Sequence, residues 1–93
     1  MNYSYVLLSE KDKRFYIGST GDLRERLREH NKGRVRSTAY RRPLCLVYYE
    51  ACLSAADASR RERYLKTGRG GRYIKQRLAS YFSEIRINKL ERH

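Results

Sequence analysis

The hydrophobic positions near the N-terminus form two short runs that are separated by a polar segment. Residues 3–9 are rich in Tyr, Val and Leu, and residues 14–19 form a second run. Runs of this length and composition predict β-strands. The connection between them, residues 10–13, is short and turn-like, so we expect an antiparallel hairpin.

Beyond the hairpin the pattern becomes helical. Thr20 and Asp22 are both possible N-caps for a helix that reaches about residue 31, and Gly33 is a typical C-terminal stop. Residues 33–43 form a basic loop without a hydrophobic period. Residues 44–53, rich in Leu, Val, Tyr and Cys, predict a third strand.

Two further helices complete the expected order of elements. One begins after Ser54 and runs to about residue 66, and Gly68, Gly70 and Gly71 are expected to break the chain after it. The last helix covers about residues 72–91, where hydrophobic residues recur at helical spacing. The order β-β-α-β-α-α predicts an α/β (α+β) fold with a small, mainly antiparallel three-stranded sheet flanked by helices.

The length of 93 residues is enough for one domain and too short for two. We expect a single domain with a core over about residues 3–66 and a helical tail over about residues 71–91. No apolar run approaches the ~18–20 residues that span a bilayer, and the N-terminus lacks signal-peptide features. The odd spacing of Cys45 and Cys52 disfavours a disulfide. A soluble cytoplasmic protein without membrane contact is therefore expected.

Charge narrows the range of partners. The chain has 22 Lys and Arg against 10 Asp and Glu, a formal net charge of +12. Half of this excess lies within residues 24–42. Such a balance favours a polyanionic partner, either a nucleic acid or an acidic membrane surface. A solvated basic face that only maintains solubility is the alternative explanation.

Two tyrosines of the hairpin are candidates for chemistry. If the turn centres on Lys11-Asp12, Tyr5 faces Gly18, and Tyr16 lies diagonally from Tyr5 on the same face. Gly18 would leave the space beside Tyr5 open to an approaching group. Because the chain contains nine tyrosines, structural roles for both are the alternative on this pattern alone.

The first helix carries two polar residues on the stripe that should face the core, which consists of Leu23, Arg26, Leu27 and His30. An arginine at the edge of a core must find an anion, because an unpaired buried charge costs several kcal/mol. For Arg26 that anion would be a phosphate or a carboxylate.

Glu62 is a similar exception on the next helix, in a stripe with Ala55, Ala58 and Leu65. A carboxylate at this position needs a cation, which would be an arginine, a lysine or a metal ion. Lys66 lies one turn further on in the favourable order. A surface pair of Glu62 and Lys66 is therefore the alternative to a metal site.

The hairpin resembles the signature of the GIY-YIG nuclease family. Tyr16-Ile17-Gly18 is the family's second motif in full. Tyr5 stands where the first motif ends, although Tyr3 and Ser4 replace its Gly and Ile.

The resemblance extends to the helices. Arg26, His30 and Glu62 stand where this family carries its arginine, its histidine or tyrosine, and its glutamate. Ser19 and Ile74 occupy positions where some members have an accessory lysine and asparagine. The similarity covers about residues 3–66, and the chain is identified as resembling a small single-domain GIY-YIG endonuclease.

The resemblance implies a divalent-metal-dependent endonuclease. Glu62 would be the sole protein ligand of one Mg²⁺ or Mn²⁺ ion, with water and phosphate oxygens completing the shell. Tyr5 or Tyr16 would help to deprotonate or orient the attacking water, assisted by His30 and the metal. Arg26 would hold the scissile phosphate and stabilise its developing charge.

The expected substrate is nucleic acid, DNA more than RNA, with contacts to its backbone. The enzyme would be structure-selective, weakly selective or guided by a protein partner, would act in DNA repair or recombination, and would be a monomer or weak homodimer. A non-catalytic nucleic-acid-binding module with the same fold, and a basic interaction protein that binds no nucleic acid, are the alternatives. The expected backbone contacts are Arg28, Lys32, Arg34, Arg36, Arg41, Arg42, Lys66, Arg69 and Arg72.

Overall fold

The computed structural model describes the backbone of residues 1–91 and the side chains of residues 1–85. It contains two compact units, of which the first is Met1–Arg63 and the second begins at Tyr64. The first unit is built on a three-stranded antiparallel sheet with the strand order β2-β1-β3. The α+β fold class expected from the sequence is confirmed. The strands are β1 (Asn2–Ser9), β2 (Phe15–Thr20) and β3 (Leu44–Cys52).

The register of the hairpin agrees with the sequence-based expectation. Tyr5 pairs with Gly18 and Leu7 pairs with Tyr16. On the other side of β1, the pairing with β3 shifts between Val6 and Leu7. An irregularity of this kind increases the local twist of a sheet.

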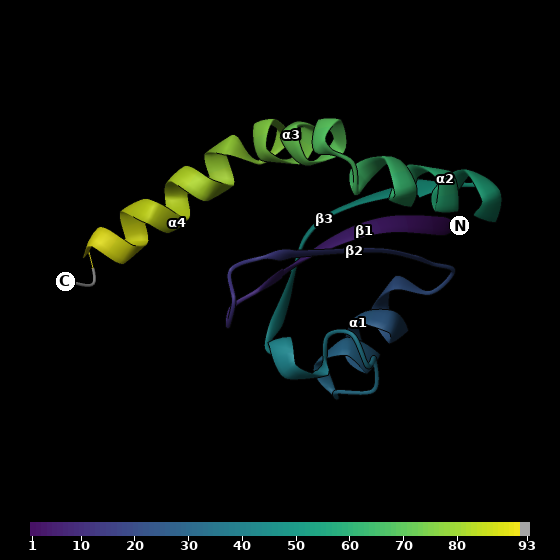
Figure 1. Cartoon of the computed structure of the whole chain (residues 1–93), viewed down its shortest axis with the longest axis horizontal. Helices are drawn as coiled ribbons and strands as arrows, with labels where there is room; N and C mark the ends of the chain where they lie inside the picture. Colours follow the sequence, from purple (N-terminus) through teal and green to yellow (C-terminus); the bar gives the residue numbers. More distant parts are fainter. Residues whose placement is uncertain (92–93) are drawn as a thin grey trace. The chain divides into compact units, whose positions relative to one another are not determined.

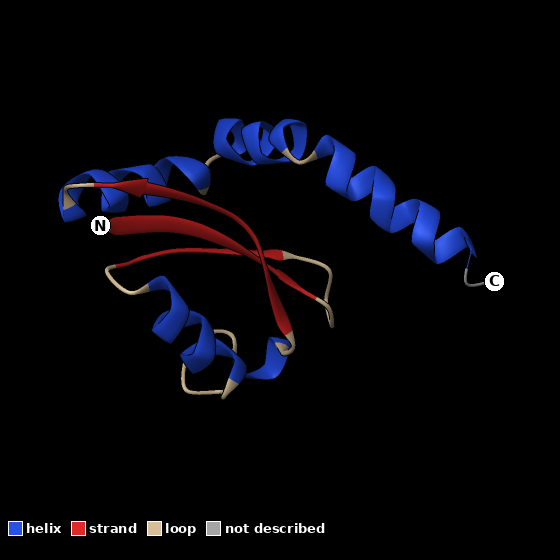
Figure 2. Cartoon of the chain, turned by 180° about the vertical axis from the view of Figure 1, so that it is seen from behind, coloured by secondary structure: helices blue, strands red, loops and turns tan. Residues whose placement is uncertain are grey.

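Helices α1 (Leu23–Asn31) and α2 (Ala55–Leu65) lie on opposite faces of the sheet (Figure 1; Figure 2). Neighbouring residues of β1 show this, because successive side chains of a strand point to opposite faces. The Ser4 hydroxyl donates to the carbonyl of Ala58 in α2 at 2.9 Å. The Tyr5 hydroxyl instead meets His30 of α1.

The core beneath α1 is formed by Tyr5, Leu7 and Leu44, all of which are buried. Leu23 and Leu27 of α1 pack against this cluster. The predicted apolar stripe of the first helix therefore does face the core.

Local hydrogen bonds fix both ends of α1. Asp22 is the N-cap and accepts a bond from the Glu25 amide at 3.1 Å, while Gly33 follows the helix with φ of 78°. The Asn31 carboxamide donates to the Leu44 carbonyl at 3.0 Å and accepts from its amide at 2.9 Å. This pair of bonds ties the end of α1 to the start of β3, across a loop that contains the short 3-10 helix η1 (Ala39–Arg41).

The second unit differs from the sequence-based expectation of one helix over residues 72–91 behind a glycine break. Helix α3 (Gly68–Arg77) includes the glycines, and α4 (Ala79–Glu91) is separate. The start of α3 is stabilised by Thr67, whose hydroxyl accepts from the Gly70 amide at 3.1 Å, a cap that offsets the poor helix propensity of glycine. Leu78 leaves the helical conformation with φ of −105° and ψ of 21°. Among the described residues, no helix is long and apolar enough to cross a membrane.

Candidate active site

The Tyr5 side chain is the centre of a cluster of three rings between the hairpin and α1. It is 1% exposed, and its Oη lies 2.8 Å from His30 Nε2. The Tyr16 ring lies 6.3 Å from that of Tyr5 and 4.9 Å from that of His30. The predicted diagonal neighbourhood of the two tyrosines is therefore confirmed, and His30 joins them.

Gly18 makes room for this cluster. A Cβ at this position would lie 2.6 Å from Tyr5 Oη and 2.7 Å from its Cζ, which is far inside van der Waals contact. The hairpin pattern predicted that the space over Gly18 is open to an approaching group. In the structure the phenol of Tyr5 itself fills this space, so that prediction was wrong. Any side chain larger than that of glycine would displace the ring.

His30 is completely buried and uses both ring nitrogens. Its Nδ1 lies 2.8 Å from Thr38 Oγ1, and the Thr38 hydroxyl donates to the Val35 carbonyl at 3.4 Å. With the Thr38 proton directed to Val35, His30 Nδ1–H donates to Thr38 and Nε2 accepts from Tyr5. Burial, together with the positive charge of Arg26, lowers the pKa of His30 to about 4, so the ring is neutral at pH 7.

The Tyr5 hydroxyl acts as the hydrogen-bond donor to His30. Its burial raises the pKa of Tyr5 to about 12; the guanidinium of Arg26 opposes this shift, and the negative charge of Glu62 adds to it. At pH 7 the phenol is therefore protonated. Its hydrogen bond holds the His30 ring in place.

Arg26 lies at the rim of the ring cluster. Its Nη1 contacts Glu29 Oε2 at 3.0 Å, and 35% of its side chain is exposed. Glu29 thus supplies the carboxylate partner that the sequence left open. An ion pair exposed to this degree contributes at most about 1 kcal/mol, so the guanidinium can exchange Glu29 for a phosphate at little cost.

Glu62 reaches the sheet from the other face. The Ser19 hydroxyl donates to its Oε1 at 2.7 Å, and Ser19 follows Gly18 on β2, an edge strand of the sheet. Tyr5, Tyr16, Arg26 and His30 lie on the α1 face, whereas Glu62 approaches the same edge strand from the α2 face. Its negative charge makes the smallest of the contributions that raise the pKa of Tyr5.

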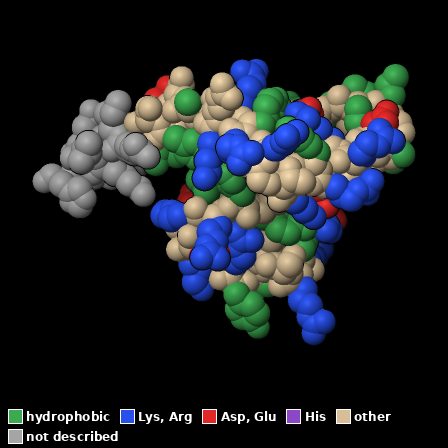
Figure 3. Space-filling view, turned by 45° about the horizontal axis from the view of Figure 1, so that its top comes forward, with side chains coloured by type: hydrophobic (Ala, Val, Ile, Leu, Met, Phe, Trp, Pro, Cys, Tyr) green, Lys and Arg blue, Asp and Glu red, His purple; other side chains and the backbone are tan. Residues whose placement is uncertain are grey.

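The basic side chains expected to contact nucleic acid are mostly exposed, and Figure 3 shows Lys and Arg side chains spread over one face of the molecule. Arg41 is the exception, because its guanidinium is held at 2.6 Å by Asp12 and donates to the carbonyls of Arg14 and Phe15. It fastens the loop to the hairpin. The exposed members are Arg28, Lys32, Arg34, Arg36, Arg42, Lys66, Arg69 and Arg72.

Two contributors to the site were not identified from the sequence. Thr38 lies in an irregular loop, and no periodicity connects it to His30. Ser19 was noted only as a departure from an accessory lysine, although its place directly after the Tyr-Ile-Gly motif is a signal that it borders the site.

Comparison with known proteins places this geometry in a family. The family model of the GIY-YIG catalytic domain matches residues 1–73. The chain belongs to the GIY-YIG family. This match includes all five residues expected to be catalytic.

Similar relatives of the chain are bacterial UPF0213 proteins. A UPF0213 protein of Bacillus pumilus is 32% identical over 93 residues, which cover 99% of this chain and 90% of the relative. UPF0213 protein CPE1444 of Clostridium perfringens is 40% identical over 67 residues, 71% of each chain. The solution NMR structure of UPF0213 protein BH0048 from Bacillus halodurans is 34% identical and covers 87% of this chain and 85% of its own, with a TM-score of 0.47. The GIY-YIG domain makes this chain a member of a nuclease family and implies nucleic-acid binding.

Proposed function

We propose that this protein is a divalent-metal-dependent endonuclease that hydrolyses phosphodiester bonds of DNA. The proposal rests on one observation: a carboxylate and a cluster of aromatic rings with an arginine both lie at strand β2. A carboxylate, Glu62, is held there by Ser19, and a ring cluster with Arg26 at its rim lies on the other face of the same strand. The catalytic core would be about residues 3–66.

The donor set fits a magnesium or manganese ion, in keeping with the general use of divalent metals by GIY-YIG nucleases. Glu62 offers hard oxygen ligands, which these ions prefer. Within the described part of the chain, no three His, Cys, Asp or Glu side chains gather into a metal cluster. Glu62 would therefore hold one ion largely completed by water and phosphate oxygens. Bound there, the ion would supply Lewis-acid stabilisation of the phosphate.

Arg26 would bind the scissile phosphate. Its partly exposed guanidinium pairs with Glu29 on the same helix and also interacts with the Tyr5 side chain, and guanidinium groups bind phosphate oxygens through two parallel hydrogen bonds. The charge that develops on these oxygens during in-line attack would be stabilised by a group already in position.

The two tyrosines would have different tasks. Tyr16 is only partly buried, so its hydroxyl is the one that can meet and orient the attacking water. Tyr5 is buried with a pKa raised to about 12, and it would position His30 and Tyr16 without contacting water. His30, a neutral ring bonded on both sides, would hold the tyrosine pair in register.

The exposed Lys and Arg side chains of the first unit, between Arg28 and Arg42, would contact the DNA near strand β2. Lys66, Arg69 and Arg72 of the second unit would add further contacts. These side chains are suited to phosphates, and phosphate contacts carry no base identity. The enzyme would therefore select substrates by structure or through a protein partner, acting as a monomer or weak homodimer in DNA repair or recombination. The free thiols of Cys45 and Cys52 support a cytoplasmic, reducing location.

The proposal is tested with branched, nicked and single-stranded DNA, incubated with Mg²⁺, Mn²⁺ or EDTA. We expect metal-dependent cleavage that is lost in Glu62→Ala and Arg26→Ala, while Glu62→Ala still binds DNA. Metal-independent binding without cleavage of any substrate would support a non-catalytic binding module. An affinity for DNA that is independent of salt would exclude both, since each neutralised duplex phosphate contributes a slope of about 0.9.

A further inference from the structure

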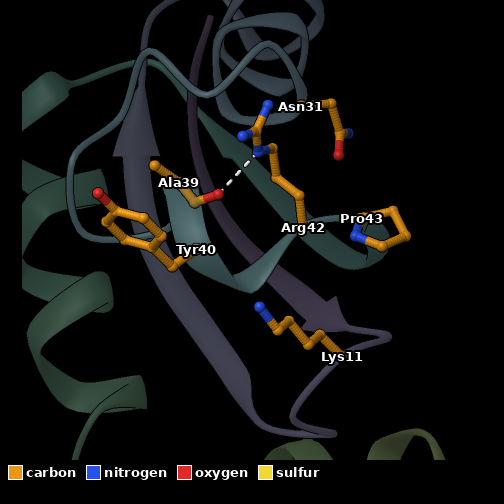
Figure 4. Close-up of a pocket in the computed structure, with 6 residues that line it drawn as sticks. All are labelled: Lys11, Asn31, Ala39, Tyr40, Arg42 and Pro43. Atoms are coloured by element: carbon orange, nitrogen blue, oxygen red, sulfur yellow. Dashed lines mark hydrogen bonds between the residues drawn. The ribbon is translucent and has the colours of Figure 1, made fainter.

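A second surface feature lies next to the ring cluster. It is a hollow lined by Lys11, Asn31, Ala39, Tyr40, Arg42 and Pro43 (Figure 4). Asn31 directly follows His30 in the chain, and Ala39 directly follows Thr38, which contacts His30 Nδ1. Two residues that line the hollow are therefore the sequence neighbours of two residues of the candidate active site.

Tyr40 is presented on this surface by an ordered turn. Its side chain is 85% exposed, compared with 53% for Tyr49 and 39% for Tyr64, the other exposed aromatic residues of the described part of the chain. The residues on either side of the turn are anchored, since Thr38 is completely buried and Arg41 is fastened to Asp12. The backbone that carries Tyr40 is therefore fixed, and an aromatic ligand would stack on it with little loss of conformational entropy.

Arg42 lines the same hollow and is held in place there. Its Nε donates to the Ala39 carbonyl at 2.7 Å, as Figure 4 shows. The guanidinium packs against Gly33, where a Cβ would lie 2.7 Å from Nη1. Gly33 has φ of 78°, so a glycine satisfies both the backbone conformation and the packing. Among the described residues, neither Arg42 nor Lys11 has a carboxylate within ion-pair distance.

We propose that this hollow is a subsite for one unpaired nucleotide that flanks the bond to be cleaved. The base would stack on the Tyr40 ring, and the phosphate would bind between Arg42 and Lys11. An exposed aromatic ring in a hollow that is also lined by cations is the combination that binds single-stranded nucleic acid. In a duplex both faces of each base are covered by its neighbours, so an intact double helix would leave Tyr40 without a partner.

This inference rests on the proposed function for its setting, but its test does not require cleavage. Binding of a labelled single-stranded oligonucleotide and of its duplex is measured in EDTA by fluorescence anisotropy. For Tyr40→Leu we expect at least about fivefold weaker binding of the single strand, the lower limit for losing one base stacked on an aromatic ring, with duplex binding unchanged. Tyr49→Leu, which removes a 53% exposed tyrosine on β3, is the matched control and should bind both as the wild type does.

Salt dependence separates the two halves of the subsite. Arg42→Gln should reduce the slope of log affinity against log salt for the single strand by about 0.7, the contribution of one neutralised phosphate. Tyr40→Leu should lower affinity with the slope unchanged. An equal loss for single strand and duplex in Tyr40→Leu, or no loss at all, would overturn the proposal.

A direct reporter is available because the chain contains no tryptophan. In Tyr40→Trp the new indole should be quenched when the single strand binds, and in Tyr49→Trp it should not. Equal quenching in both variants, or in neither, would contradict a stacked base at Tyr40. If the wild type cleaves no substrate but these binding and quenching results are obtained, the proposed nuclease function is wrong and the nucleotide subsite is still supported.

Discussion

Replacing Gly18 by alanine tests the ring cluster most severely. The added Cβ would lie 2.6 Å from Tyr5 Oη, whereas ordinary van der Waals contact begins at 3.4 Å. The phenol must therefore move by about 1 Å, which takes the 2.8 Å bond to His30 out of hydrogen-bond geometry. Overpacking of this kind and an unpaired buried nitrogen each cost about 1–3 kcal/mol. We expect Gly18→Ala to lower the free energy of unfolding by about 2–4 kcal/mol and, because Tyr16 packs on the same rings, to slow cleavage by about 100-fold.

The assay combines urea unfolding with single-turnover cleavage. Gly21→Ala is the matched control, because the nearest atom to a Cβ at this position is 3.8 Å away and the backbone needs no glycine there. It should fold and cut as the wild type does. A Gly18→Ala protein with wild-type stability and wild-type rate would refute the argument that Tyr5 must lie across Gly18.

Three further predictions concern the supports of the site. Thr38→Val keeps the side-chain shape but removes the partner of His30 Nδ1, so urea unfolding should show a loss of about 1–3 kcal/mol; no loss would mean that the hydrogen bond is not needed. Because the pKa of His30 falls from 6.5 to about 4 on folding, the unfolded chain binds the proton more readily, and stability should decrease by up to about 3 kcal/mol as the pH falls from about 6.5 to 4. His30→Asn should remove this dependence and His93→Asn should keep it, while the reverse pattern would contradict the assignment. Ser19→Ala should weaken binding of Mn²⁺ by about 10-fold in calorimetric titrations, as loss of a group that orients a ligand does, and unchanged affinity would exclude Ser19 from orienting Glu62.

The hairpin and the first helix could be predicted from sequence because each obeys one strict period. A turn centred on Lys11-Asp12 fixes the partner of every strand residue, and so placed Tyr5 against Gly18 as observed. The stripe of Leu23 and Leu27 identified the core face of α1 in the same way.

The other features of the fold and the site depend on contacts that the hydrophobic periodicity of the sequence does not determine. The break at Leu78 between α3 and α4 was missed because the hydrophobic spacing continues through it. The contact of Thr38 with His30 requires the actual path of an irregular loop. The partner of Arg26 was open because phosphate and carboxylate are equally suited to it, and the structure supplies Glu29.

The most direct test of the nuclease assignment compares wild type with Glu62→Gln on the best DNA substrate under single-turnover conditions. Glutamine keeps the shape of the side chain but removes the charge that would hold the ion. The account predicts that Glu62→Gln binds the substrate within about twofold of wild type and cuts it at least about 100-fold more slowly, the loss typical of removing one electrostatic stabiliser. Cleavage by Glu62→Gln at the wild-type rate, or no metal-dependent cleavage by the wild type on any substrate, would contradict it.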